Sequence, residues 1–257
     1  MRRVLVTGAS GQLGKCIQKI VKNYADLTFE FHNSETLDLT DSKMILAIFS
    51  NGNFDYCINC AAYTNVEQAE KTPGPAYEVN AEAVRKLAEK CLEYQVTLLH
   101  ISTDYVFDGK KETGYFPDDK TNPINAYGKS KLKGEVYIQE LLEHYFIVRT
   151  SWLYSEFGKN FYKTILKKAE AGEDLQITDE QTGCPTNANN LAAYVLDLVK
   201  HSATNYGIHH FTDGISMTWY GFAKQIVGNK QLNVKVAPKN YPSLVKRPKH
   251  VILRERR

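Results

Sequence analysis

The first fourteen residues place the strongest constraint on the fold of this chain. Residues 4–7 (VLVT) form an apolar run, and Gly8, Gly11 and Gly14 follow it at three-residue spacing. A short apolar run bounded by glycine predicts a buried strand, and the residues from Gln12 onward have the periodicity of an amphipathic helix. A strand, a glycine-rich turn and a helix in this order predict that the chain opens with a βαβ unit of a parallel sheet.

Each glycine in this turn has its own physical reason. Gly8 permits the tight turn off the strand, Gly11 lets the backbone approach a pyrophosphate, and Gly14 allows the helix to pack closely on the sheet. The anion then rests on the free N–H groups and the positive dipole end of the helix. The turn therefore predicts a dinucleotide-binding site at the start of the chain.

The same alternation continues through the first half of the chain. Apolar runs that predict buried strands cover residues 4–7, 27–31, 56–59, 96–101 and 146–148, and helical patterns cover residues 12–23, 42–49, 76–94 and 126–142. Short apolar strands separated by amphipathic helices predict βαβ units whose parallel sheet is covered on both faces. We therefore expect an α/β fold with a doubly wound parallel sheet of the Rossmann type.

After about Thr150 the pattern loosens. Helical patterns at residues 160–171, 188–200 and 218–227 alternate with short strands, and a proline-rich segment follows. We expect a smaller C-terminal substrate lobe that is interleaved with the first domain. The dinucleotide-binding domain is predicted to comprise residues 1–152 and about 187–204, and the lobe residues 153–186 and 205–257.

Composition narrows the class of protein. The 257 residues carry a formal net charge of only +3 without a long basic run, so a nucleic-acid partner is not expected. No apolar stretch reaches the ~18 residues that span a bilayer, and the first residues lack the layout of a signal peptide. The five cysteines are odd in number and scattered, which argues against a disulfide framework. These features predict a cytoplasmic protein that binds neither membrane nor nucleic acid.

The end of the second predicted strand bears on the choice between NADH and NADPH. A carboxylate at this point would bond the ribose 2′-hydroxyl and favour NAD. The segment reads Glu30-Phe31-His32-Asn33-Ser34, with no carboxylate after Glu30. Because side chains alternate along a strand, either Glu30 or Phe31 faces the cofactor, and Asn33 and Ser34 are able to bond a 2′-phosphate. The segment favours NADPH and leaves NADH open.

A tyrosine and a lysine at the start of a predicted helix form the candidate catalytic pair. Tyr127 and Lys131 lie four residues apart and so share one helix face. A phenol has a pKa of about 10, and a cation one helical turn away lowers it. Such a pair would protonate a carbonyl oxygen while hydride reaches its carbon. Ser102 and Thr103 end the fourth predicted strand, where doubly wound sheets bind ligands, so either hydroxyl could share that oxygen with Tyr127.

Taken in order, the motifs of this chain resemble those of a known family. The motifs are GASGQLG at residues 8–14, INCAAYTNVEQAE at 58–70, VN at 79–80, STDYVFDG at 102–109, NAYGKSK at 125–131, RTSWLY at 149–154 and QTGCPT at 181–186. The set resembles the dTDP-4-dehydrorhamnose reductase family, within the extended short-chain dehydrogenase/reductase superfamily. The resemblance runs from Val4 to about Thr186, with a looser match through Arg247-Pro248.

The resemblance implies an oxidoreductase of dTDP-rhamnose and polysaccharide biosynthesis. Its reaction would be the reduction of the 4-keto group of dTDP-4-dehydro-L-rhamnose to dTDP-L-rhamnose with NADPH or NADH. The implied catalytic residues are Thr103, Tyr127 and Lys131, with Tyr127 as proton donor and Thr103 tuning it. The residues expected to contact the cofactor are Gly8, Gly11, Gln12, Leu13, Gly14, Asp38, Leu39, Ala61, Ala62, Tyr63, Thr64, Ser102, Tyr127 and Lys131. The residues expected to contact the sugar nucleotide are Thr103, Asp104, Tyr105 and Trp152.

Related proteins suggest other functions. Sugar-nucleotide 4,6-dehydratases carry Asp-Glu after the threonine, whereas this chain carries Asp104-Tyr105, which disfavours water elimination. A non-catalytic regulatory subunit resembling the methionine adenosyltransferase beta subunit need not retain the Thr/Tyr/Lys set. A reductase of another nucleotide-linked 4-keto-6-deoxy sugar stays open, because Asp104 and Trp152 do not identify the nucleotide.

The chain departs from the family at two places. Family members continue beyond the Arg-Pro motif with another helical segment, whereas this chain ends about ten residues after Arg247 with three arginines among its last four residues. The resemblance therefore leaves the completeness of the substrate lobe open at this end. Some members dimerise through a cation held by glutamates, the first of which would fall near Lys15 or Cys16, so no metal site is expected. Monomer and homodimer both stay open.

Overall fold

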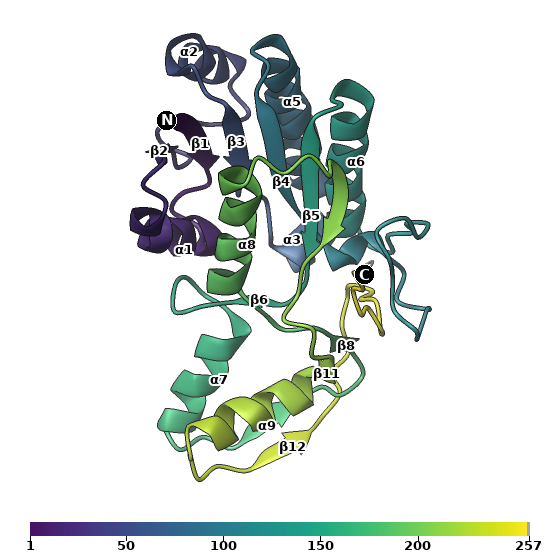
Figure 1. Ribbon diagram of the computed structural model, residues 1–257. Helices are drawn as coiled ribbons and strands as arrows, with labels where there is room; N and C mark the ends of the chain where they lie inside the picture. The colour runs from purple at the N-terminus through teal and green to yellow at the C-terminus, as the bar shows by residue number, and fades with distance from the viewer. Residues whose placement is uncertain (256–257) are drawn as a thin grey trace.

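The computed structural model describes residues 1–255, and Arg256 and Arg257, two of the arginines at the end of the chain, lie outside that range. Within it, a parallel six-stranded sheet has the order β10-β5-β4-β3-β1-β2 (Figure 1). Its strands are β1 (Arg2–Thr7), β2 (Leu27–Phe31), β3 (Tyr56–Asn59), β4 (Thr97–Thr103), β5 (Tyr145–Thr150) and β10 (Gly207–His210). The chain winds outward from β1 in both directions, which confirms the doubly wound Rossmann-type sheet.

Helices cover both faces of the sheet and enclose two apolar cores (Figure 1). On one face, α1 (Gln12–Ile20) packs against α8 (Ala188–Lys200). On the other face lie α2 (Ser42–Gly52), α5 (Ala83–Glu93) and α6 (Ala126–Leu141). The short helices η1 (Val21–Asn23), α3 (Val66–Lys71) and η3 (Asp104–Val106) occupy the connections. Both faces of a parallel sheet need such covers, because its strands are apolar on both sides.

Side-chain caps explain where two of these helices begin. Asp41 accepts a hydrogen bond from the Lys43 N–H at the start of α2, and Asn125 accepts one from the Gly128 N–H at the start of α6. Each cap satisfies one of the N–H groups that a helix start leaves without an intrahelical partner. The Asn125 cap matters for function, because it fixes the first turn of the helix that carries Tyr127.

The helix predicted over residues 76–94 is divided in the structure. It begins with α4 (Pro73–Tyr77), passes through a π-helical segment, η2 (Glu78–Glu82), and continues as α5. Helix α6 packs closely on this segment, since a Cβ added to Gly134 would lie 2.2 Å from the Asn80 carbonyl oxygen. The wider π turn therefore occurs where the backbones of two helices meet. The hydrophobic periodicity of the sequence does not predict such a long-range contact.

A smaller lobe lies below the carboxyl ends of the strands (Figure 1). Helix α7 (Phe161–Glu170) packs on α9 (Trp219–Asn229) over an apolar core of its own. Three two-stranded ribbons complete this region: β6 (Leu153–Tyr154) with β9 (Thr186–Asn187), β8 (Thr182–Gly183) with β11 (Met217–Thr218), and β7 (Leu175–Ile177) with β12 (Val236–Pro238). The assignment of residues 205–257 to the lobe is wrong for β10, which pairs with β5 at the edge of the main sheet.

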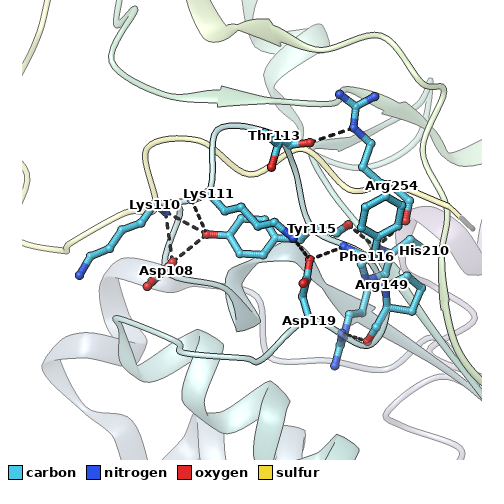
Figure 2. A network of polar contacts seen from close by, with 11 residues as sticks. Asp108, Lys110, Lys111, Thr113, Tyr115, Phe116, Asp119, Arg149, His210 and Arg254 are labelled. Carbon is cyan, nitrogen blue, oxygen red and sulfur yellow. Dashed lines mark hydrogen bonds and ion pairs between the residues drawn. The ribbon is translucent and has the colours of Figure 1, made fainter.

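The long loop between β4 and α6 is braced by the last described residues of the chain. Tyr115 N–H donates to the Ile252 carbonyl at 2.7 Å, and Arg254 N–H donates to the Tyr115 carbonyl at 2.8 Å. The Tyr115 hydroxyl donates to Asp108 and accepts from the N–H groups of Lys110 and Lys111, as Figure 2 shows. These hydrogen bonds hold the loop at its centre.

No helix within residues 1–255 has the length and apolar character needed to cross a membrane.

Candidate functional site

A cavity of about 610 Å³ lies where the lobe meets the carboxyl ends of the strands. Its volume is in the range of small-molecule binding sites. Doubly wound folds bind their ligands at this edge of the sheet. Predicted site residues that line it are Gly11, Gln12, Leu13, Ala62, Thr64, Ser102, Thr103, Asp104, Tyr105, Tyr127, Lys131 and Trp152. The structure thus brings together the glycine turn, the end of β4, the start of α6 and the segment after β5.

The other predicted contacts do not line this cavity: Gly8, Gly14, Asp38, Leu39, Ala61 and Tyr63. Gly8 has a φ of +64°, and a Cβ there would lie 2.5 Å from the Ala61 backbone nitrogen. A Cβ on Gly14 would lie 2.6 Å from Ala9 Cα. These glycines serve the tight turn and close packing, as their positions in the motif predict. Asp38 accepts two hydrogen bonds from Thr40. Cofactor contact by these residues stays a prediction.

The start of α1 fits the pyrophosphate of a dinucleotide. Its N-cap residue is Gly11, and no side chain caps the first turn, so the N–H groups there are left to a ligand. Gly11 also lacks the Cβ that would stand between this turn and the cavity it lines. Free N–H groups at the positive end of a helix dipole favour an anion. The residues present therefore fit the cofactor that the glycine motif predicts.

Gln12 connects this cofactor turn to the lobe. Its Nε2 donates to the Leu153 carbonyl at 3.2 Å, and its Oε1 accepts from Ser155 Oγ at 3.0 Å and Asn160 Nδ2 at 2.7 Å. Asn160 in turn caps α7. The sequence predicted cofactor contact for Gln12 but gave no signal for this role, because its partners lie more than 140 residues away.

The two hydroxyls at the end of β4 face different partners. Ser102 Oγ donates to the Glu135 carboxylate, which forms a buried ion pair with Arg149 at 2.7 Å. Thr103 Oγ1 donates to Asp104 Oδ1 at 3.1 Å, and the Thr103 hydroxyl lowers the pKa of the Tyr127 phenol. Sequence reasoning left open which hydroxyl accompanies Tyr127. In the structure it is that of Thr103.

The pKa of Tyr127 corrects one expectation. We predicted that Lys131 would depress it, but burial raises the pKa of Tyr127 above its usual value, and Asp104 and Tyr105 add to the rise. The Thr103 hydroxyl lowers the pKa of Tyr127 and so offsets part of this effect. The prediction fails because it considered only a charge on the same helix face, whereas removal from water penalises the phenolate more strongly.

Lys131 is 1% exposed and contacts strand β4. Its Nζ donates to the Ile101 carbonyl at 2.7 Å and lies 3.2 Å from His100 Nε2. Burial lowers the pKa of Lys131 to about 8, and the charges of Glu135 and Cys60 act in the opposite sense. An ammonium without water around it loses its proton more readily, because desolvation disfavours the charged form.

Asp104 is a second buried acid beside the candidate catalytic tyrosine. The side chain is 3% exposed, and burial raises its pKa to about 7. Hydrogen bonds from the Thr103 hydroxyl and from backbone N–H groups limit the rise. Asp104 therefore titrates near neutral pH, where an ordinary aspartate is fully ionised.

Trp152 has a conformation that sequence reasoning missed. Its φ is +46°, its ring stacks on Trp219 with centroids 3.5 Å apart and 6° between the planes, and a Cβ on Gly183 would lie 2.5 Å from the indole. Trp219 and Phe161 of the lobe also line the cavity, although nothing in the sequence marked them. Trp152, which we expect to contact the sugar nucleotide, is thus one ring of a stacked pair, and the second ring, that of Trp219, comes from α9.

Tyr105 links the cavity to a second, larger one. Its ring meets Tyr127 edge-on at 5.5 Å, and its hydroxyl accepts from Arg247 Nη1 at 2.9 Å. Arg247 also forms an ion pair with Glu67 at 2.6 Å. The second cavity, of about 1,260 Å³, is lined by Arg247 together with Lys110, Lys246 and Lys249. Glu67, Asp108 and Glu180 line this cavity as well, so charges of both signs face it.

Two cysteines of the third strand region differ in surroundings. Cys57 is buried against Cys91 in the core. Cys60 instead lines the first cavity, where burial raises the pKa of its thiol. Within the described range, no group of three or more His, Cys, Asp or Glu side chains is arranged to hold a metal ion.

The whole chain, residues 1–257, matches the family model described as the RmlD substrate binding domain. The chain belongs to the RmlD family. It is 36% identical to the dTDP-4-dehydrorhamnose reductase of Aggregatibacter actinomycetemcomitans, over 96% of this chain and 89% of the relative. It is also 36% identical to a dTDP-4-keto-6-deoxy-D-glucose reductase of Streptomyces niveus, over 86% of this chain and 76% of the relative.

Solved structures agree with this membership of the RmlD family. The dTDP-4-dehydrorhamnose reductase from Bacillus anthracis, crystallised in complex with NADP, superimposes with a TM-score of 0.95 at 36% sequence identity. The match covers 99% of this chain and 91% of that structure. The resemblance inferred from the motifs is therefore confirmed along this chain, with its lobe included.

Proposed function

We propose that the chain reduces the 4-keto group of dTDP-4-dehydro-L-rhamnose to dTDP-L-rhamnose with NADPH in the cytoplasm. The observation that carries the proposal is the placement of Thr103, Tyr127 and Lys131 in one cavity with the uncapped glycine turn. Family membership and the NADP-bound relative support the reaction and the cofactor. A non-catalytic regulatory subunit would have no need for this set of buried polar groups.

The cofactor, when bound, supplies hydride to the carbon of the keto group. Tyr127 supplies the proton to the oxygen, and the raised pKa of its buried phenol keeps that proton in place until the oxygen gains negative charge. Thr103, whose hydroxyl acts on the pKa of this phenol, orients it. Lys131 lies one helical turn further along α6, where it would hold the cofactor ribose.

The remaining residues position the sugar nucleotide. Asp104 and the Trp152–Trp219 pair border the sugar end of the first cavity. The nucleotide diphosphate extends past Tyr105 towards Arg247 and the lysines that line the second cavity. A lobe that closes on the sheet excludes water from the reacting oxygen, which strengthens the hydrogen bond from Tyr127.

A second candidate substrate is supported by one relative. The Streptomyces niveus protein is named a reductase of dTDP-4-keto-6-deoxy-D-glucose, which differs from the first candidate in the configuration of the sugar. Both sugars carry the 4-keto group that Tyr127 would protonate. The same chemistry serves either one, and the fit of the sugar against Trp152 and Asp104 decides between them.

A turnover screen tests the proposal. We expect oxidation of NADPH with dTDP-4-dehydro-L-rhamnose, and a loss of about 10²-fold or more in Tyr127→Phe, while NADPH binding stays within about threefold. Tyr137→Phe is the matched control, because this tyrosine lies on the same helix with its hydroxyl on Glu82, outside the cavity. Full activity of Tyr127→Phe would exclude the mechanism. NADPH binding without turnover of either sugar would instead favour a regulatory subunit.

A further inference from the structure

A row of buried polar side chains crosses the sheet beside Lys131. Thr7, Asn59 and His100 are direct cross-strand neighbours on β1, β3 and β4, and each is at most 1% exposed. The Thr7 hydroxyl donates to Asn59 Oδ1 at 2.7 Å, Asn59 Nδ2 lies 3.0 Å from His100 Nδ1, and His100 Nε2 lies 3.2 Å from Lys131 Nζ. Buried polar groups need hydrogen-bond partners, so the direction of each bond can be worked out.

A backbone group fixes the orientation of the Asn59 amide. The Ala61 N–H donates to Asn59 Oδ1 at 3.1 Å, and a backbone N–H cannot accept a hydrogen bond. Turning the amide would set its NH₂ group against this N–H. The oxygen of Asn59 therefore faces Ala61, and its NH₂ group donates to His100 Nδ1.

This orientation fixes the tautomer of His100. Burial, and then the charge of Lys131, lower the pKa of His100 well below its usual value, so the ring is neutral and carries one proton. Since Nδ1 accepts from Asn59, the proton resides on Nε2 and points at Lys131 Nζ. An ammonium has no lone pair to accept it, so this hydrogen bond forms only when Lys131 is a neutral amine.

We propose that the Thr7–Asn59–His100 row is a positioning device that favours the release of a proton from Lys131. The inference deepens the proposed reduction and rests on it. Once Tyr127 has protonated the sugar oxygen, its phenolate regains a proton that Lys131, one helical turn away in the same cavity, releases: an N–H bond of Lys131 breaks and the O–H bond of Tyr127 forms. The amine that remains accepts the N–H of His100, and solvent later returns its proton.

The other groups around Lys131 do not favour the release of its proton as His100 does. Glu135 on α6 and Cys60 after β3 both raise the pKa of Lys131, and Glu135 is itself paired with Arg149. Asp104 and Tyr105 act on the pKa of Tyr127. Among these groups, His100 is the one whose N–H requires Lys131 to be neutral.

The decisive variant is Asn59→Asp, which keeps the shape of the side chain. One carboxylate oxygen accepts hydrogen bonds from the Thr7 hydroxyl and the Ala61 N–H, and the other accepts a hydrogen bond from the Nδ1–H of His100. Nε2 then becomes an acceptor for the Lys131 ammonium, which raises the pKa of Lys131. Thr7→Val is the matched control, because it removes one bond to Asn59 Oδ1 but leaves the Ala61 N–H that fixes the amide.

Two measurements test the proposal on the full chain. Long-range ¹H–¹⁵N NMR reports the tautomer of His100, whose signals are identified by their loss in His100→Gln. We expect the proton on Nε2 in the wild type and in Thr7→Val, and on Nδ1 in Asn59→Asp. The single-turnover rate of NADPH oxidation falls at high pH as Lys131 loses its proton, and this fall should move up by about one pH unit in Asn59→Asp and stay in place in Thr7→Val.

The outcomes separate this inference from the proposed function. A wild-type ring with its proton on Nδ1, or on both nitrogens, overturns the inference, and this spectrum needs neither substrate nor variant. An inverted tautomer in Asn59→Asp without a shift of the pH profile also overturns it. If the wild type turns over neither keto sugar, the proposed function fails, while the tautomer and its response to pH between 7 and 10 still decide the role of the row.

Discussion

Replacing Asp104 by asparagine should stabilise the protein at alkaline pH. Burial raises the pKa of Asp104 to about 7 from its ordinary value of 3.8. Between these two values the unfolded chain releases this proton while the folded chain keeps it, so the free energy of unfolding falls as pH rises. Above pH 7 the folded protein bears the full free-energy cost of the buried, ionised Asp104 carboxylate. Asparagine does not titrate, and its Oδ1 still accepts from the Thr103 hydroxyl, as that of Asp104 does.

The size of the effect follows from the pKa difference. About three pH units correspond to up to about 4 kcal/mol between pH 4 and pH 8. The quantity to measure is the free energy of unfolding of Asp104→Asn minus that of the wild type. Other titrating groups, such as the buried His100 and His210, contribute to both proteins and cancel in the difference.

Urea unfolding followed by circular dichroism, at five pH values from 4 to 8, measures this difference. Asp119→Asn is the control of opposite sign, because the hydrogen bond from Lys111 lowers the pKa of Asp119. This variant should be less stable than the wild type near neutral pH, and its deficit should shrink as pH falls. A difference for Asp104→Asn that stays constant or decreases as pH rises would refute the assignment of a buried, late-titrating carboxyl.

Three further substitutions probe other parts of the structure. Gly183→Ala places a Cβ 2.5 Å from the Trp152 indole; overpacking of 1–3 kcal/mol should raise the KM for the sugar nucleotide about tenfold or more, and an unchanged KM would contradict the stacked wall. Glu135→Leu leaves the buried Arg149 guanidinium without its carboxylate, so urea unfolding should show a loss of about 3–5 kcal/mol, and a loss below 1 kcal/mol would argue against the pair. Tyr115→Phe removes the three hydrogen bonds of its hydroxyl, and a thermal melt should report a loss of about 1–3 kcal/mol.

Local patterns in the sequence predicted most of the sheet and its helices. The bounds of β2, β3 and α8 agree with the expected ranges, because each element is a short apolar run or an amphipathic repeat that is complete in itself. The division of residues 76–94 could not be predicted in this way, since the π-helical turn follows from the contact of Gly134 with Asn80. The same limit applies to β10, whose place in the sheet depends on β5.

The candidate site was predicted where a motif carries it and missed where packing creates it. Thr103, Tyr127 and Lys131 lie in recognisable motifs, and the structure gathers them in one cavity. Trp219 lies in an ordinary helical pattern, and only the fold of the lobe stacks it on Trp152. The pKa of Tyr127 was misjudged for a related reason, because the depth of burial is a property of the whole fold.

The bracing of the β4–α6 loop by residues 249–254 has a consequence for synthesis on the ribosome. Those residues bond both the loop at Tyr115 and strand β8 at Thr182, and β8 carries the Gly183 against which Trp152 rests. Translation delivers the glycine turn, β4 and α6 well before this brace. A nascent chain therefore completes its nucleotide-cofactor half first, and the walls of the sugar half are secured only after residue 254 has left the exit tunnel.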